Sequence, residues 1–166
     1  MHVHSFPPIA RTDAWKLILG SMPGRASLAA NRYYAHPRNS FWRIVGALLS
    51  FPPDAPYAQR CVKIVGAGIA LWDVLKTCTR SGSLDASIVA SSMASNDFPA
   101  FFREHPEIGI IFFNGAKAES IYMRHVRPGL PDDLAAIPSR RLPSTSPANA
   151  SLSFSAKLAR WKAIRD

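Results

Sequence analysis

Three stretches of the chain combine glycine or proline with polar side chains that can hold a ligand: 20–24 (GSMPG), 113–115 (FNG) and 142–149 (LPSTSPAN). Glycine lets a backbone turn tightly and approach a bound molecule closely. The Asn114 amide offers both a donor and an acceptor, and the hydroxyls of Ser144 and Ser146 can donate to phosphate oxygens. These groups suit a ligand that carries phosphates and hydrogen-bonding edges.

Two common catalytic motifs do not fit the first stretch. No Gly-Lys-Ser/Thr follows it, which excludes a Walker-type phosphate loop. Ser21 directly follows Gly20, so the stretch is not the Gly-x-Ser-x-Gly elbow of hydrolases. A serine hydrolase built on Ser21 or Ser144 stays an alternative, and it requires His and Asp within hydrogen-bond reach of one serine. The five histidines show no metal-ligand spacing, and two cysteines are too few for a four-cysteine iron–sulfur cluster, so we expect no metal.

The net charge of +9 is concentrated in two segments. Segments 16–43 and 140–165 hold five and six basic residues respectively, and neither contains Asp or Glu. If the fold brings them together, they form a positive face suited to a polyanion. The alternative is an ordinary solvated surface that happens to be basic. No apolar run is long enough to span a membrane, and the N-terminal residues lack a signal-peptide pattern, so we expect a cytoplasmic protein.

Alternating strand and helix patterns indicate an α/β fold. Apolar runs predict strands at 15–20, 66–75, 108–115 and, more briefly, from 140 onward. Helical spacing predicts helices over 40–51, 96–106 with Asn96 as the cap, 116–126 and 153–164, and a short one within 83–88. Such alternation implies parallel crossovers in one domain that spans 1–166. Ligands bind beyond the carboxyl ends of such strands, where all three polar stretches lie.

Four motifs carry a resemblance to a known superfamily, and two further stretches are similar to one branch of it. GSMPG, a ten-residue gap and AHPRNSFW (35–42) resemble the mismatch-specific uracil-DNA glycosylases, which carry G-I-N-P-G and A-H-P-x-N-x-F-W at the same spacing. FFNGAKA (112–118) resembles the base-pocket strand of that superfamily, and LPSTSPAN resembles its DNA-inserting loop. GIALWDVL (68–75) and GSLDASI (82–88) are similar to the hypoxanthine-DNA glycosylase branch. The resemblance implies a three-layer α/β/α sandwich around a short, mostly parallel sheet.

The resemblance also implies a function. We expect a DNA repair glycosylase that flips out a deaminated base, hypoxanthine in first place and uracil in second, and removes it by hydrolysis. Lys117 could form a Schiff base and cut the strand, but we expect it to point away from the pocket, which favours a monofunctional enzyme. Since water is the expected nucleophile, the resemblance implies no organic cofactor. The expected partner is DNA at the nucleoid, bound by a monomer. The alternatives are a uracil- or mismatch-specific enzyme and a catalytically impaired DNA-binding relative.

One departure from the family bears on catalysis. Met22 stands where relatives place Asp or Asn, and a thioether cannot orient a water or act as a base. The resemblance to the hypoxanthine branch assigns this role to Asn39, whose carbonyl can hold a water below the sugar. The alternative for Asn39 is a turn or cap before the helix that begins near Ser40.

The expected base-binding residues are Ser21, Met22, Tyr34 and Asn114. Backbone N–H groups of Ser21 and Met22 and the amide of Asn114 can bind the base edge, and Tyr34 can stack on the base. The alternatives are a strand-end turn for Asn114 and simple loop packing for Tyr34.

The remaining predicted contacts are with DNA: Gly24, His36, Arg38, Ser144, Thr145, Ser146, Pro147, Ala148 and Asn149. Prolines stiffen the last loop so that it can compress the DNA backbone, with Ala148 and Asn149 at its tip. His36 has an equal alternative as a turn-stabilising residue before Pro37, and the loop as a whole could be a plain Ser/Pro surface loop.

Overall fold

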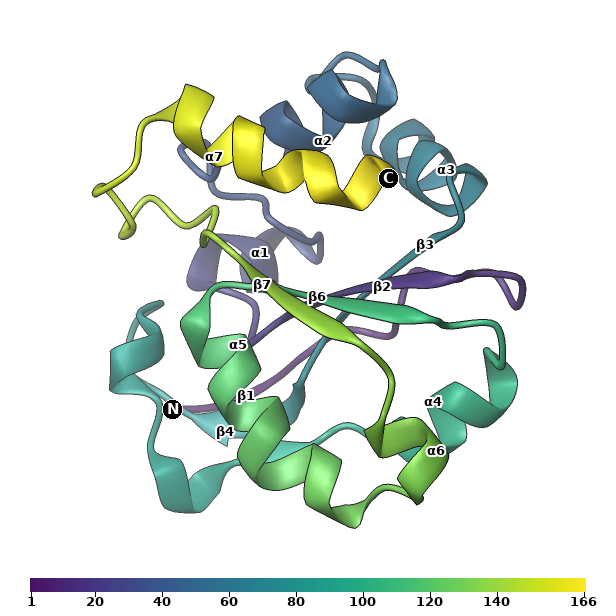
Figure 1. Ribbon diagram of the computed structural model, residues 1–166. Helices are drawn as coiled ribbons and strands as arrows, with labels where there is room; N and C mark the ends of the chain where they lie inside the picture. Colours follow the sequence, from purple (N-terminus) through teal and green to yellow (C-terminus); the bar gives the residue numbers. More distant parts are fainter.

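The computed structural model describes residues 1–166, and its centre is a sheet of four parallel strands (Figure 1). Their order across the sheet is β3 (Ile69–Asp73), β2 (Lys16–Gly20), β6 (Ile110–Asn114) and β7 (Ser139–Leu142). The strands expected at 15–20, at 108–115 and from 140 are therefore confirmed. The apolar run 66–75 ends its strand at Asp73, and a separate strand, β4 (Leu75–Thr79), begins two residues later.

Both faces of this sheet are covered. In β2, Leu17 and Leu19 pack on one face and Ile18 packs on the other, as the alternation of side chains along a strand requires. Because both sets are buried, the strand is a continuous apolar run rather than an alternating one. The same division places Ile111 and Phe113 of β6 on the first face and Phe112 on the second.

One layer of helices covers the face of Ile18 and Phe112 (upper part of Figure 1). It contains α2 (Phe41–Leu49), α3 (Tyr57–Gly66) and α7 (Phe154–Trp161). An aromatic cluster joins α2 to α7, since the Phe41 ring meets Trp161 edge to face at 5.9 Å between centroids. Burial of such rings supplies a large share of the apolar area in this layer.

The opposite layer holds the other helices and a small sheet. The helices are α4 (Phe98–Glu104), α5 (Ala116–Ile121), which continues in a π turn over Tyr122–Val126, and α6 (Asp132–Ala135). The small antiparallel sheet contains β1 (His2–His4), β4 and β5 (Ala94–Ser95). The three-layer α/β/α architecture predicted from the sequence is thus confirmed.

Three helices and one cap differ from the sequence-based prediction. Helix α1 (Arg25–Ala30) lies in the stretch expected to be a loop, and the sequence analysis predicted neither α3 nor α6. Helix α4 is capped by Asp97, whose Oδ1 accepts from Ala100 N at 3.0 Å. The predicted cap, Asn96, instead donates from Nδ2 to the Asp73 and Leu75 carbonyls and fixes the junction between β3 and β4.

The two basic segments meet in the fold, since α2 from the first packs beside α7 from the second (Figure 1). Not all of their charges face solvent, however. Lys16 is buried and donates to the Ile164 carbonyl, and Lys157 is buried as well. Arg43 lies over the Phe154 ring, 4.1 Å from its centroid. No helix combines the length and the apolar character that a membrane span needs.

Candidate active site

A cavity of about 740 Å³ opens where the parallel strands end. Gly20, Asp73 and Asn114 end three of the strands and line the cavity, and Ser144 follows the fourth strand by two residues. All fourteen residues predicted to bind the base or DNA or to act in catalysis line this one cavity. The strand-end rule therefore located the cavity, although lining a cavity does not assign a role to any residue.

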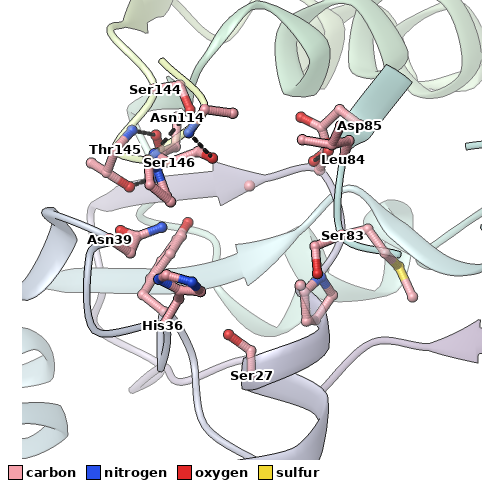
Figure 2. A pocket seen from close by; sticks show the side chains of 18 of the residues that line it. Ser27, His36, Asn39, Ser83, Leu84, Asp85, Asn114, Ser144, Thr145 and Ser146 are labelled. Carbon is pink, nitrogen blue, oxygen red and sulfur yellow. Dashed lines mark hydrogen bonds between the residues drawn. The ribbon is translucent and has the colours of Figure 1, made fainter. Parts of the chain in front are cut away.

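Asn39 lies at the start of α2 and on the cavity wall across from Leu84 and Asp85 (Figure 2). Its Oδ1 accepts from the Phe41 backbone N at 2.9 Å, so the residue also serves as the helix-start turn that was the alternative. This bond fixes the orientation of the amide. It leaves the second lone pair of Oδ1 and both protons of Nδ2 available.

Asn114 is locked to the loop that follows β7. Its Nδ2 donates to Thr145 Oγ1 at 3.0 Å, and its Oδ1 accepts from Thr145 N at 2.9 Å (dashed lines, Figure 2). The Thr145 carbonyl in turn accepts from Ser40 N at 3.0 Å and from Ser40 Oγ at 3.3 Å. Thr145 is only 1% exposed, and these bonds hold the site together, whereas its contact with DNA stays a prediction. Asn114 keeps one proton and one lone pair for the cavity.

The loop 143–149 is stiffened by short-range hydrogen bonds. Ser144 Oγ accepts from Ser146 N, and Ser146 Oγ accepts from Ala148 N, each at 3.2 Å. Asn149 Nδ2 donates back to the Ser144 carbonyl at 3.1 Å. Because both serine oxygens act as acceptors, both hydroxyl protons stay free to donate outward. At the tip, Pro147 and Ala148 are exposed.

The stretch 20–24 contributes backbone groups to the cavity more than side-chain groups. The backbone N–H groups of Ser21 and Met22 donate to no backbone carbonyl. The Ser21 hydroxyl is used within the protein, since it donates to Asp85 Oδ1 at 2.6 Å. Met22 is 7% exposed and packs in the hydrophobic core while it reaches the cavity wall. A thioether fits this place because most of it is buried among apolar side chains.

Tyr34 has a left-handed backbone conformation with φ of 55° and stacks its ring on Phe41, with 4.1 Å between centroids. Phe41 is fully buried and does not line the cavity, whereas Tyr34 does, so a ligand in the cavity can contact Tyr34 and not Phe41. On the rim, His36 Nδ1 accepts from Arg38 N at 3.1 Å, which is the turn role weighed for His36, and leaves Nε2 free. Arg38 itself is exposed.

The structure brings together neither the residues of a serine hydrolase nor those of a metal centre. Ser21 bonds to Asp85 and Ser144 bonds to Ser146, so neither candidate nucleophile has a histidine partner. No group of three or more His, Cys, Asp or Glu side chains is placed to share a metal ion. Lys117 is not among the cavity-lining residues.

Comparison with known proteins identifies the family of this chain. The family model of the uracil DNA glycosylase superfamily matches residues 7–166. The chain belongs to the uracil DNA glycosylase superfamily. The resemblance predicted from the motifs is therefore confirmed.

Individual relatives indicate which branch of the superfamily this chain resembles. A Methanosarcina barkeri protein named hypoxanthine DNA glycosylase is 34% identical over 119 residues, which cover 71% of this chain and 74% of that protein. A Methanosarcina acetivorans protein of the same name is 37% identical over 114 residues, covering 68% and 71%. A solution NMR structure of a Methanosarcina acetivorans protein, proposed to be a uracil DNA glycosylase, matches with a TM-score of 0.81 and 32% identity over 99% of this chain and 98% of that one.

Sequence reasoning missed an acidic pair in the cavity of this uracil DNA glycosylase superfamily member. Asp73 ends β3 and Asp85 lies in a 3-10 turn, Asp85–Ser87. Burial raises the pKa of Asp73 to about 7; the charge of Asp85 adds to this rise and Arg80 opposes it. Burial also raises the pKa of Asp85, against the hydrogen bond from Ser21. The signal was present, because Asp73 directly follows the apolar run IALW and so obeys the same strand-end rule.

Proposed function

We propose that this protein is a DNA repair glycosylase that takes a deaminated base, hypoxanthine above all, into the cavity and hydrolyses its N-glycosidic bond. The observation that carries this proposal is the arrangement of Asn39, Tyr34, Asn114 and the loop 143–149 around one cavity in a chain of this superfamily. The names of the two relatives favour hypoxanthine over uracil as the substrate. We further infer that residues 1–166 act as one domain and as a monomer, on DNA at the nucleoid.

The shape of the site suits a flipped nucleotide. A base inside a duplex cannot be reached by a buried catalytic group, so the nucleotide must swing out. A cavity of about 740 Å³ has room for a nucleotide, in the ordinary range of small-molecule sites. The Tyr34 ring would stack on the base, which contributes about 1–3 kcal/mol.

Asn39 would position the attacking water. Breaking the C–N bond develops positive charge on the sugar and negative charge on the base. The Asn39 amide is already fixed by its bond to Phe41 N, and its remaining lone pair can hold a water below the sugar. A fixed carbonyl dipole also stabilises the positive charge of the transition state without reorganising. Since an amide is not a base, Asn39 orients the water, and the proton that the water loses on bonding to the sugar passes to the departing base anion.

The departing base would be received by donors on the other side of the cavity. The free N–H of Asn114 and the backbone N–H groups of Ser21 and Met22 can donate to acceptors of the base, either a carbonyl oxygen or a ring nitrogen. Such donors hold the negative charge that develops on the leaving base. Because Lys117 does not line the cavity, water is the nucleophile and the product is an abasic site.

DNA would bind at the rim of the cavity. The free hydroxyl protons of Ser144 and Ser146 and the exposed Arg38 can bind phosphate oxygens on either side of the flipped nucleotide. The backbone of Gly24 and the free Nε2 of His36 line the same rim. The tip of the loop, with Pro147 and Ala148 exposed and Asn149 half-buried, would occupy the gap that the nucleotide leaves.

The test is base release across a panel of duplexes. Each duplex carries one inosine, uracil, xanthine or undamaged base, and the products are analysed with and without alkali, which cuts only at abasic sites. We expect breaks at inosine after alkali and none without it, with slower breaks at uracil. Intact strands with every base would favour the impaired DNA-binding relative, for which Met22 is the sequence argument. Breaks without alkali would mean that the enzyme also cuts the strand.

A further inference from the structure

Two buried polar groups meet at the floor of the cavity. A Cβ atom placed on Gly20 would lie 2.5 Å from Asp73 Oδ1 and 2.9 Å from Tyr34 Oη. Both groups therefore crowd over the end of the central strand, in space that exists because residue 20 has no side chain. Asp73 is 3% exposed and lines the cavity.

Neither group is satisfied within the protein. The buried side-chain atoms without a hydrogen-bond partner are Tyr34 Oη, Asp73 Oδ2 and one nitrogen of Arg80. A buried polar atom without a partner costs about 1–3 kcal/mol, and more when it is charged. The charge of Arg80 partly offsets that of Asp73, but Arg80 forms no hydrogen bond to it, since two of its nitrogens donate to the Pro23 and Gly82 carbonyls and the third has no partner. A buried carboxyl that the protein leaves open in a ligand cavity calls for a partner from the ligand.

The depth of Asp73 in the cavity indicates which part of the ligand it meets. Arg38 is exposed at the rim and Asn39 is half-buried, whereas Asp73 is almost fully buried at the floor. A flipped nucleotide keeps its phosphates in the DNA backbone, so they stay at the rim and the base enters first. The floor therefore meets the far edge of the base.

Resting on the proposed function, we propose that Asp73 is a specificity-determining residue whose carboxylate accepts the ring N–H of the deaminated base. Deamination replaces the bare ring nitrogen of adenine or cytosine with an N–H beside a carbonyl. A carboxylate can accept from that N–H, whereas the lone pair of the parent base would face its negative charge. Hypoxanthine and uracil share this edge, so one residue selects both products over both parents.

The test compares binding of two duplexes that cannot be cleaved. They carry 2′-fluoro-2′-deoxyinosine or 2′-fluoro-2′-deoxyadenosine at the same position, and dissociation constants are measured by fluorescence anisotropy. Wild type prefers the inosine duplex, and Asp73→Asn loses about 10- to 100-fold of that preference, as expected for a hydrogen bond to a charged group. The cost of unpairing each base is common to both proteins and cancels in the comparison. The exposed Asp54→Asn is the matched control and keeps the preference.

A pH titration of wild type supplies a measurement that needs no variant. The charged and titratable groups that face Asp73 are Asp85, Arg80, Tyr33 and Tyr34. Since the raised pKa of Asp73 lies at about 7, the preference for inosine should fall as the pH is lowered from about 8 to about 6. Asp85→Asn removes a negative neighbour, so it should move this fall to lower pH, whereas Asp73→Asn should abolish it.

The outcomes separate the two proposals. If wild type prefers inosine and a folded Asp73→Asn keeps that preference, the assignment of Asp73 is wrong and the proposed function stands. If Asp73→Asn does not fold, a wild-type preference that is constant over the same pH range overturns the assignment. If wild type shows no preference for the inosine duplex, both proposals fail.

Discussion

Gly20→Ala is the most direct perturbation of the cavity floor. The backbone at residue 20 is not left-handed, so alanine can adopt it. The added methyl, however, would lie 2.5 Å from Asp73 Oδ1 and 2.9 Å from Tyr34 Oη, where ordinary contacts are 3.4–4 Å. The two side chains must therefore move away by roughly 0.5 to 1 Å, which for overpacking corresponds to about 1–3 kcal/mol of stability.

The functional loss should exceed the loss of stability. A displacement of about 1 Å among groups that position a substrate costs on the order of 100-fold in rate. We expect base release from an inosine duplex under single-turnover conditions to fall by about this factor, while circular dichroism still shows a folded protein. Gly66→Ala is the matched control, because nothing lies within 4 Å of its Cβ position at the end of α3. Gly20→Ala with the wild-type rate and melting temperature would refute the described floor.

Three further changes test the rest of the site. Asn39→Ala should slow base release at least about 100-fold, because it removes the amide dipole that holds the water. It should also lower the free energy of unfolding by about 1 kcal/mol, because the bond to Phe41 N is lost. Full activity of this variant would contradict the catalytic role of Asn39. Asn114→Ala should alter which base is released and lower stability by about 1–3 kcal/mol, because it strands two buried groups of Thr145. Thr145→Val should reproduce only part of that loss, and equal loss would contradict the two-bond lock. Arg38→Ala should reduce by about 1 the magnitude of the slope of the log of the DNA association constant against the log of the salt concentration. An unchanged slope would mean that Arg38 does not contact a DNA phosphate.

The sequence predicted the elements whose pattern depends on burial alone. Apart from Lys16 at the start of β2 and Asn114 at the end of β6, these two strands are apolar because both faces of the sheet are covered, and α2 carries its apolar face at helical spacing. Helix α3 was not predicted, although its apolar residues recur at helical spacing as clearly as those of α7, and only Ile64 of its residues is buried.

Within the site, the sequence predicted which residues gather and not what they bond. Asn114 and Thr145 are 31 residues apart, and nothing local to either indicates their paired hydrogen bonds. The roles of Asn39, Tyr34 and the loop residues stay predictions until the variants are measured. Asp73 could have been found by applying to β3 the rule already applied to its neighbours in the sheet.

The bonds of Thr145 have a consequence for how this enzyme can change. Through one residue, the end of β6, the loop after β7 and the first turn of α2 are tied into a single piece. A loop grafted from a relative with another substrate would leave Asn114 or Ser40 without its partner. New base preferences are therefore reached either by exchanging all three segments together or at positions outside this joint, such as the floor beneath the base.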